Sequence, residues 1–581
     1  MNSLDDVEVV QPVPALTGMT AYSTPKHPAP IDLHLDGNEG VLPPEALLQT
    51  LEGLGADELR RYPDALPLEE ALARRFGVDP VRVVVTAGGD DALERAVRAV
   101  VGPGRNLVLP VPSFEMLGRF ARLSGGDVVE LPWPEGTPFP ILGVLAAITP
   151  DTAAVAVVSP NNPTGGVATA EDILRIARAA PGVLVLADLA YVEFADEDPT
   201  PHLLDLPNVA VFRTMSKAWS LAGLRVGYAI ATPEVAGWMR ATGLPYPCSR
   251  PSLALAGARV ASGEAAMRRF TNDVRNERNQ LSANLAGLGA TVFPSQANFI
   301  LARFDDALFV RDGLAGQGIA VRAFPGNPRL EGRLRITCPG DAVAFARLQN
   351  ALQITMNPQA LLFDMDGVLA DVSDSYRQAI IDAAAAFGVH LSAQEVAKAK
   401  REPGSNNDWV VTRRLLAARG VDATLEEVTV QFETAYQGSD AAPGLWTRES
   451  LAVPHATLER LAARLPLGIV TGRPRGDAER FLRHAGIDGL FSAVVCMGDA
   501  PAKPDPAPVQ LAMQRLNVNR AWMIGDAPDD VRAARSAGVL PLGIVTPGED
   551  SGESTGALMI AGASRVVDSV AQLEGLLPQL A

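Results

Sequence analysis

Hydrophobic residues in the first 356 positions fall into short runs that are separated by longer amphipathic stretches. The runs are typical of buried strands, as in Val81–Thr86, Asn106–Pro110, Ala153–Ser159 and Val183–Asp188. The stretches between them are rich in Ala, Leu and Arg and predict helices. This alternation is typical of an α/β fold with a mostly parallel sheet.

The pattern changes shortly after residue 340. A helix predicted near Ala342–Gln353 is followed by Asn357-Pro358, and a new buried strand, Ala360–Phe363, begins at once. We therefore place a domain boundary between residues 357 and 358. The linker is short and lacks a Gly/Ser or Pro-rich spacer, so we expect the two halves to be held close together.

The second half begins with a strand, continues with a helical insertion and then returns to the α/β pattern. Residues 373–464 are helical in pattern, as in Trp409–Arg419, and Leu467–Val470 resumes the strands. We predict a core of residues 358–372 and 465–581 and a helical cap of about residues 373–464. Pro547–Gly556 resembles a mobile loop.

Composition limits the possible functions of the chain more than its possible folds. With 47% hydrophobic and 20% charged residues, the chain resembles an ordinary globular protein, and its 581 residues imply about three to five folding units. The net charge of -17 disfavours nucleic acids and anionic membranes as partners. Three cysteines without Cys-x-x-Cys spacing, and no apolar run near the roughly 20 residues that span a bilayer, favour a cytoplasmic protein.

The first candidate site surrounds the block Thr214-Met215-Ser216-Lys217. A lysine amine can bond to the aldehyde of pyridoxal phosphate, and we predict that Lys217 does so. Asp188 ends a predicted strand and can pair with the ring nitrogen, while Tyr191 and Asn162 can reach the ring oxygen. Each residue alone is usually a surface lysine, a cap or a loop residue, but the combination favours cofactor chemistry.

A phosphate-binding site is predicted close to that lysine. Ala87-Gly88-Gly89-Asp90 lies between a predicted strand and a helix that we expect to begin at about Asp91. Backbone N–H groups at such a helix start can face an anion. Thr214 and Ser216 add hydroxyls and Arg225 adds a guanidinium, so the set predicts a phosphate cup.

On these residues the chain resembles the fold type I pyridoxal-phosphate aminotransferases over about residues 15–355, and within them the histidinol-phosphate aminotransferases. The resemblance implies a large α/β/α domain of about residues 46–260 and a small α/β domain from the N-terminal segment and about residues 261–357. It also implies a homodimer, in which Tyr62 reaches the cofactor of the neighbouring subunit. The cofactor-binding residues that it implies are Gly89, Asp90, Phe114 (stacked on the ring), Asn162, Asp188, Tyr191, Thr214, Ser216, Lys217, Arg225 and Tyr62.

The same resemblance points to residues that hold the substrate. They are Tyr22, Asn298, Arg322 and Arg335. Two guanidinium groups suit a phosphate or a carboxylate, although arginines often form only ordinary surface ion pairs. The chain has Asn38-Glu39-Gly40 where Asn-Glu-Asn is usual, near the expected substrate entrance, so its ketone substrate can differ from the imidazole compound of the family.

The second candidate site begins with two aspartates after the strand Ala360–Phe363. Asp364 can attack phosphorus, and Asp366 can protonate the leaving oxygen and then activate water. Further along the chain, Thr471 and Lys503 can bind phosphoryl oxygens. Asp526 and Asp530 can join Asp364 as magnesium ligands. Each of the four segments, which carry Asp364 with Asp366, Thr471, Lys503, and Asp526 with Asp530, is alone usually a solvated turn. Their order along the chain predicts the site.

This ordered set resembles the haloacid dehalogenase superfamily over residues 358–581, with a Rossmann-like core and a helical cap of the subfamily I type. The resemblance implies that the backbone carbonyl of Asp366 also binds magnesium, and an acid at this position favours hydrolysis of a phosphate monoester. In the cap, Gly404–Trp409 is either a substrate contact or a helix N-cap loop with Trp409 in the cap core.

Together the two sites predict a bifunctional enzyme that aminates a phosphorylated ketone and then removes the phosphate. In histidine biosynthesis, with glutamate as donor, imidazole acetol phosphate would become L-histidinol phosphate and then L-histidinol. The chain lacks the zinc-binding Cys/His loop of the familiar bacterial histidinol-phosphate phosphatase of this superfamily. Another phosphorylated amine or amino acid of specialised metabolism therefore stays open, as does a regulatory, ligand-binding role for one half.

Overall fold

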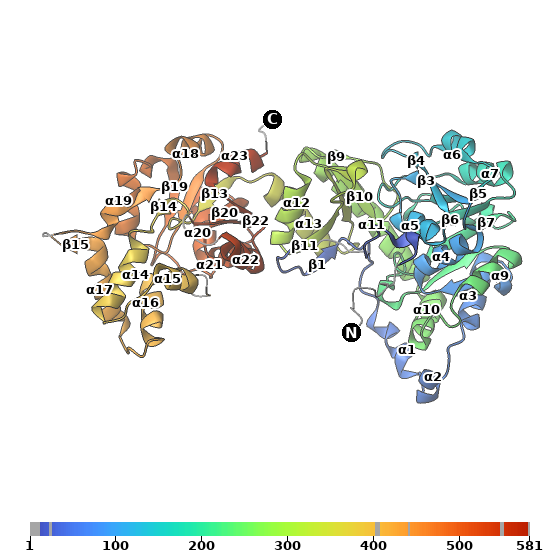
Figure 1. Cartoon of the computed structure of the whole chain (residues 1–581), viewed down its shortest axis with the longest axis horizontal. Helices are drawn as coiled ribbons and strands as arrows, with labels where there is room; N and C mark the ends of the chain where they lie inside the picture. Colours follow the sequence, from blue (N-terminus) through green and yellow to red (C-terminus); the bar gives the residue numbers. More distant parts are fainter. Residues whose placement is uncertain are drawn as a thin grey trace, which may run out of the picture. The chain divides into compact units, whose positions relative to one another are not determined.

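A computed structural model gives the structure of the chain and describes residues 12–21, 26–400, 402, 407–439, 442–546 and 551–578. The described residues divide into two compact units, whose elements are labelled in Figure 1. The first takes in Leu35–Arg303 and Phe324–Phe345, and the second takes in Lys26–His34, Phe304–Ala323 and the chain from Ala346 onward. Lys217 lies in the first unit and Asp364 in the second. The predicted boundary at residues 357 and 358 stays a prediction.

A seven-stranded sheet forms the centre of the first unit, in the order β2-β8-β7-β6-β5-β3-β4. Neighbouring strands from β7 to β4 run parallel, whereas β8 is antiparallel to β2 and β7. The prediction of a mostly parallel sheet is therefore confirmed. The strands are β2 (Val83–Thr86), β3 (Asn106–Val111), β4 (Asp127–Pro132), β5 (Thr152–Val158), β6 (Leu184–Asp188), β7 (Val209–Thr214) and β8 (Gly227–Ile230).

Helices cover this sheet. Side chains of α4 (Gly88–Val100), α5 (Glu115–Leu123) and α9 (Pro233–Thr242) share one hydrophobic cluster with alternate residues of the strands. β5, β6 and β7 are buried along their whole length, as expected of parallel strands covered on both faces. The other long helices of the unit are α3 (Leu66–Phe76), α6 (Ile141–Ala147), α7 (Ala170–Ala179), α10 (Arg250–Ser262) and α11 (Glu264–Gly287).

A second group of strands in the first unit is antiparallel. β10 (Phe299–Arg303) pairs with β12 (Arg333–Thr337) on one side and with β9 (Thr291–Val292) on the other. α11 contacts β9 and β10. This group places Asn298 directly before β10 and Arg335 in the middle of β12.

The second unit is built on a six-stranded sheet in the order β19-β18-β13-β20-β21-β22, and every pair in it is parallel. The strands are β13 (Ala360–Phe363), β18 (Leu467–Val470), β19 (Phe491–Val495), β20 (Ala521–Gly525), β21 (Leu540–Ile544) and β22 (Arg565–Val567). Two hydrophobic clusters pack on the sheet, one of them with α20 (Ala507–Leu516) and α21 (Pro528–Ser536). β13, β18 and β20, which carry the predicted chemistry at their carboxyl ends, are neighbours in the middle of the sheet.

The cap leaves and rejoins this core through a pair of short strands. β14 (Ala370–Asp371) and β17 (Ser450–Leu451) pair antiparallel, so the two connections lie side by side. Between them the described residues form α14 (Tyr376–Ala386), α15 (Ala393–Lys400), α16 (Asp408–Ala417), α17 (Leu425–Gln437) and η8 (Leu445–Arg448). α14 contacts the other three helices. We call β14 and β17 the hinge strands.

Two local predictions are wrong. α4 begins at Gly88 and not near Asp91, so Gly89 and Asp90 belong to its first turn. The stretch predicted as a mobile loop is helical from Ser551, in α22 (Ser551–Ala561), while Pro547–Asp550 lies outside the described residues. The Ser and Gly residues of this stretch are typical of loops, but here they belong to a helix that buries Leu558 and Ala561 against Val531.

None of the described helices combines the length and the apolar character needed to cross a membrane.

Candidate active sites

The first site lies where β5, β6 and β7 end. These three strands are parallel neighbours, so their carboxyl ends meet at one edge of the sheet. Asp188 is the last residue of β6, Thr214 is the last residue of β7, and Asn162 follows β5 by four positions. Lys217 comes three residues after β7, in a bend. The strand order therefore brings together residues that are far apart in sequence.

Lys217 is half-buried and its amine is held by a single backbone contact. Its Nζ donates to the carbonyl oxygen of Gly37 at 2.8 Å and lies 5.7 Å from the centre of the Tyr191 ring. Burial, aided by the positive charge of Arg335, lowers the pKa of Lys217 to about 8. A lysine in this state supplies a neutral, nucleophilic amine close to neutral pH.

Asp188 and Tyr191 are both buried. Burial raises the pKa of Asp188 to about 7, and its Oδ1 accepts from the backbone N–H of Ala190 at 3.2 Å. The Tyr191 hydroxyl accepts from Nδ2 of Asn38 at 3.0 Å. Burial of a charged carboxylate is costly, so a cationic ring nitrogen would stabilise Asp188.

Asn38 was not predicted as a site residue, yet it connects several of them. It is fully buried, with a φ of 54°, a conformation that Asn tolerates better than most residues. Its Oδ1 accepts from the Thr337 hydroxyl at 2.9 Å, and its backbone oxygen accepts from Nδ2 of Asn298 at 3.2 Å. In the sequence it appears only within Asn38-Glu39-Gly40, and no spacing there reveals these contacts.

Arg335 and Asn162 meet directly. NH1 of Arg335 donates to Oδ1 of Asn162 at 2.6 Å, and NH2 donates to the backbone oxygen of Asp36 at 2.5 Å. The predicted substrate residue thus lies beside a predicted ring partner. Asn298 is also buried, and its Oδ1 has no hydrogen-bond partner among the described residues.

The predicted phosphate cup is assembled around Ser216. Its hydroxyl accepts from the Thr214 hydroxyl at 3.0 Å and lies 3.4 Å from NH1 of Arg225. NH2 of Arg225 in turn pairs with Asp90 at 3.1 Å. Gly88, at a φ of 87°, starts α4 so close to Arg225 that a Cβ there would lie 2.5 Å from its NH2. Hydroxyls, a guanidinium and the start of α4 therefore converge.

Gly40, where the chain departs from the family pattern, packs closely against the chain between Lys217 and Ser220. A Cβ at this position would lie 2.2 Å from Oγ of Ser220 and 2.9 Å from the backbone oxygen of Lys217. The larger residue that is usual in the family does not fit this backbone without a shift.

Four predicted residues are not joined to this group. Phe114 is half-buried at the start of α5 and packs against the hydrophobic cluster of the sheet. Tyr62 is 80% exposed and stacks on Tyr246, with ring centres 4.6 Å apart. Arg322 lies in β11 (Ile319–Ala323), which belongs to the second unit, and Tyr22 lies outside the described residues. Their roles stay predictions.

These residues fit pyridoxal phosphate. A lysine with a lowered pKa, a buried aspartate with a raised pKa and a cup of phosphate donors are three features that suit the cofactor. Gly88 lies close to Arg225 and has no side chain, so the cup stays open where a side chain would fill it.

The second site joins the ends of β13, β18 and β20 in the second unit. Asp364 directly follows β13 and is buried. Its Oδ1 lies 2.6 Å from Nζ of Lys503, and the same Nζ lies 2.5 Å from Oδ1 of Asp530. Burial works to lower the pKa of Lys503, but these two carboxylates raise it above its ordinary value. Lys503 therefore stays charged in the site.

Three carboxylates crowd this lysine. Oxygens of Asp364, Asp526 and Asp530 all lie within 4.8 Å of one another. Burial raises the pKa of Asp364 well above its ordinary value, and burial together with Asp530 raises that of Asp526 to about 7. Lys503 contacts Asp364 and Asp530, and NH2 of Arg377 lies 3.9 Å from Asp526. A divalent cation with a preference for oxygen ligands fits among the three clustered oxygens. The side chain of Asp366 is not part of this cluster.

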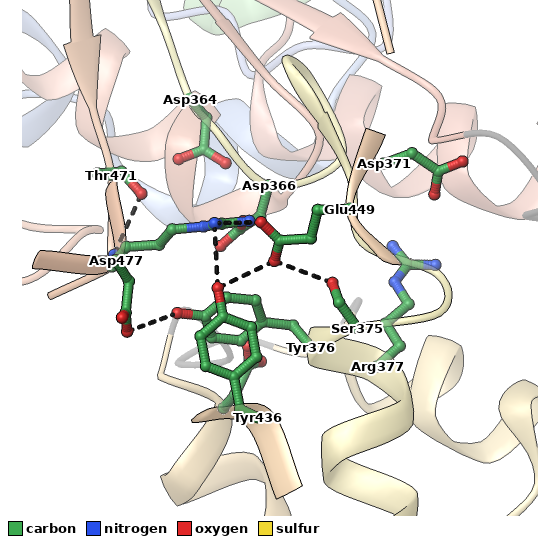
Figure 2. A network of polar contacts seen from close by, with 12 residues as sticks. Asp364, Asp366, Asp371, Ser375, Tyr376, Arg377, Tyr436, Glu449, Thr471 and Asp477 are labelled. Carbon is green, nitrogen blue, oxygen red and sulfur yellow. Dashed lines mark hydrogen bonds and ion pairs between the residues drawn. The ribbon is translucent and has the colours of Figure 1, made fainter. Parts of the chain in front are cut away.

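Asp366 instead contacts an arginine from the loop after β18. Its Oδ1 lies 2.6 Å from both Nε and NH2 of Arg473. Thr471, two residues earlier, accepts from the backbone N–H of Arg473 at 3.1 Å. Figure 2 shows Asp364, Asp366 and Thr471 above a network that includes the cap residues Ser375, Tyr376, Tyr436 and Glu449 and the core residue Asp477. Arg473 was not predicted as a site residue, although it lies two positions after the predicted Thr471.

The cap segment around Trp409 behaves as a helix start. Asn407 caps α16 by accepting from the backbone N–H of Val410 at 3.2 Å, and Trp409 packs against the hydrophobic cluster of the cap and core. Asp408 pairs with Lys400 at 2.8 Å. Gly404–Asn406 lies outside the described residues, so a substrate contact there stays a prediction.

Two family models match the chain. The family model for aminotransferase class I and II matches residues 32–352, which is more than half of the chain. The chain belongs to the aminotransferase class I and II family. After the aminotransferase part of the sequence, the family model for haloacid dehalogenase-like hydrolase matches residues 358–538. The predicted fold class, a fold type I aminotransferase followed by a haloacid dehalogenase-like domain, is thereby confirmed.

Individual relatives agree with this assignment. A histidinol-phosphate aminotransferase from Trichormus variabilis is 32% identical over 314 residues, covering 53% of this chain and 88% of that protein. The crystal structure of the histidinol-phosphate aminotransferase from Sinorhizobium meliloti, in complex with pyridoxal-5'-phosphate, shows 27% identity and a TM-score of 0.54, covering 59% of this chain and 97% of that one.

A further relative carries a different name. The imidazoleglycerol-phosphate dehydratase of Phytophthora nicotianae is 46% identical over 197 residues, which is 32% of this aminotransferase-family chain. The chain spans 44% of that protein's length.

Proposed function

We propose that the chain carries out two consecutive reactions of histidine biosynthesis. The first site transfers an amino group from glutamate to imidazole acetol phosphate and forms L-histidinol phosphate. The second site hydrolyses this phosphate monoester to L-histidinol. One observation carries the proposal: a chain 32% identical to a histidinol-phosphate aminotransferase also holds the aspartate cluster and lysine of a phosphatase site.

The similarity to imidazoleglycerol-phosphate dehydratase supports the same pathway. Loss of water from a glycerol phosphate side chain leaves a ketone next to the phosphate ester. That ketone, imidazole acetol phosphate, is the compound that the first site would aminate.

In the first reaction, bound pyridoxal phosphate supplies the carbonyl that exchanges amino groups and a ring that withdraws electrons. Lys217, with its lowered pKa, would bond to the cofactor and carry a proton to and from the α-carbon of the substrate. Asp188 would keep the ring nitrogen protonated, and Asn162 and Tyr191 would hold the ring oxygen. The phosphate would be bound by Gly89, Asp90, Thr214, Ser216 and Arg225, and the substrate by Asn298, Arg335 and the predicted Tyr22 and Arg322.

In the second reaction, Asp364 attacks phosphorus while Asp366 gives a proton to the departing alkoxide oxygen, which releases the amino alcohol. Asp366 then takes a proton from water, and the water oxygen attacks the aspartyl phosphate to release inorganic phosphate and restore Asp364. Thr471 and Lys503 would hold the phosphoryl oxygens. Asp364, Asp526, Asp530 and the Asp366 carbonyl would bind magnesium, which offsets negative charge.

We also propose a homodimer in the cytoplasm. Tyr62 and Tyr246 stack on each other and are 80% and 57% exposed, and Leu42 and Leu244 are 94% and 77% exposed. In a homodimer, a second copy would cover such side chains. The cysteines are free and buried, which suits a reducing compartment.

Separate disabling of the two sites tests the proposal. In Lys217→Ala, transamination should fall roughly a thousandfold or more, while hydrolysis of L-histidinol phosphate persists; Asp364→Asn should do the reverse. Amination is followed by glutamate-dependent product formation and hydrolysis by phosphate release. Loss of both activities from either single change would contradict two independent sites.

Gly40 favours a second candidate, in which the same chemistry acts on another phosphorylated amine. The backbone at this position excludes the larger family residue, so the substrate entrance differs. If both reactions run on other phosphorylated substrates but L-histidinol phosphate is not hydrolysed, this second candidate is correct.

A further inference from the structure

Arg473 links the candidate acid of the second site to the cap. It is fully buried in the loop between β18 and α19 (Arg475–His484). Nε and NH2 both lie 2.6 Å from Oδ1 of Asp366, and NH1 donates to Oε2 of Glu449 at 2.8 Å. Asp366 belongs to the core and Glu449 to the cap, so one guanidinium joins the two parts.

The link combines one guanidinium with the carboxyl groups of Asp366 and Glu449. Burial alone would lower the pKa of Arg473, but Asp366, Tyr376 and Glu449 raise it well above the ordinary value. The guanidinium also lies 4.6 Å from the centre of the Tyr376 ring, a cation–π distance. A buried ion of this kind becomes costly when one partner moves away.

Glu449, the cap residue of this link, lies next to the hinge strands. Glu449 directly precedes the hinge strand β17, and Ser375 follows the hinge strand β14 by four residues. The hydroxyls of Ser375 and Tyr436 both donate to Oε1 of Glu449 at 3.0 Å. Figure 2 shows Ser375, Tyr436 and Glu449 converging beside Asp366. Rotation of the cap about the hinge strands would therefore move the anchor of Arg473.

We propose that Arg473 is a positioning residue that couples seating of the cap to the orientation of Asp366. With the cap seated, Glu449 fixes the guanidinium, and the guanidinium holds the Asp366 carboxyl at a defined place beside Asp364. With the cap displaced, the link to Glu449 breaks and Asp366 is no longer held. The proposal rests on the phosphatase chemistry of this site and not on the identity of its substrate.

The test compares phosphate esters that differ in their need for the acid. An alkyl phosphate such as glycerol 2-phosphate releases a poor leaving group that must be protonated, whereas p-nitrophenyl phosphate releases a stable phenolate. The full-length chain is used, with Arg473→Lys, which keeps the charge but cannot bind both carboxylates, and Glu449→Gln, which keeps the shape. The ratio of kcat/KM for the alkyl ester to that for the aryl ester is measured.

A matched control is available in Arg480→Lys. Arg480 also crosses from the core to the cap, donating to Gln437 and Asp477 at 2.8 Å, but its described contacts do not include Asp366. We expect the alkyl-to-aryl ratio to fall at least about tenfold in Arg473→Lys and Glu449→Gln and to stay unchanged in Arg480→Lys.

An equal loss on both esters would leave the ratio unchanged and show that Arg473 only supports the fold, and unchanged rates on both esters would show that it does not position Asp366. Either result overturns the proposal. Asp364→Asn in the same assay shows whether hydrolysis arises from this site, which separates failure of the phosphatase assignment from failure of the coupling.

Discussion

At the scale of single residues, burial works to lower the lysine pKa in both sites, but the neighbouring charges differ. In the first site, burial lowers the pKa of Lys217 to about 8 and raises that of Asp188 to about 7. In the second, Lys503 stays charged because two carboxylates touch it. The same residue type thus has a lowered pKa in one site and stays charged in the other.

The pKa of Lys217 gives a pH prediction. Only the deprotonated amine attacks an aldehyde, so the rate at which the apoprotein takes up pyridoxal phosphate should rise with pH and level off above about 8. Stopped-flow absorbance measures this rate. In Arg335→Gln the midpoint should move to higher pH, because a positive charge that lowers the pKa is removed. A wild-type midpoint near that of free lysine would contradict the burial argument.

The residues that sequence reasoning identified share one property: their chemistry is visible in a short stretch of chain. Lys217 with its hydroxyl neighbours, and Asp364 with Asp366, are examples. Asn38 and Glu449 were missed because their contacts are long-range, 153 residues to Tyr191 for the first and 24 residues to Arg473 for the second. A single sequence contains no signal for such pairs.

At the scale of elements, strand ends position most of the chemistry. The buried strands were predicted closely, and Ala360–Phe363 and Leu467–Val470 match β13 and β18 at both ends. Continuous apolar runs bounded by polar residues make such strands easy to recognise. Helix limits were harder, because Gly88 starts α4 with a left-handed residue and α22 contains Ser and Gly residues that usually indicate loops.

The start of α4 gives a prediction at this scale. Gly88→Ala places a Cβ 2.5 Å from Arg225 and puts alanine at a φ of 87°, so the cup should be distorted. We expect the affinity for pyridoxal phosphate to fall by about tenfold or more, measured by absorbance titration. Gly237→Ala, in α9 with open space around it, should leave the affinity unchanged. Equal affinity in Gly88→Ala would mean that this turn does not bind the phosphate.

At the scale of the whole molecule, Lys217 and Asp188 lie in the first unit and the aspartate cluster lies in the second. The two activities should therefore depend on different additives. Removing divalent cations with EDTA should lower phosphate release by at least about a hundredfold, because the three clustered carboxylates would lose the cation that joins them. Glutamate-dependent amination should be unaffected.

Restoring magnesium should recover hydrolysis, and phosphate release is measured throughout. Hydrolysis that survives complete removal of divalent cations would rule out Asp364, Asp526 and Asp530 as a required metal site. A fall in amination under the same treatment would show that the two units do not act independently.

Fusion of consecutive enzymes raises the local concentration of the intermediate that they share, without any new contact. The most direct test supplies the purified chain with pyridoxal phosphate, magnesium, glutamate and imidazole acetol phosphate, and follows the products by mass spectrometry. We predict transient L-histidinol phosphate followed by accumulation of L-histidinol. Stable accumulation of L-histidinol phosphate, or no product from protein with bound cofactor, would contradict the two-step account.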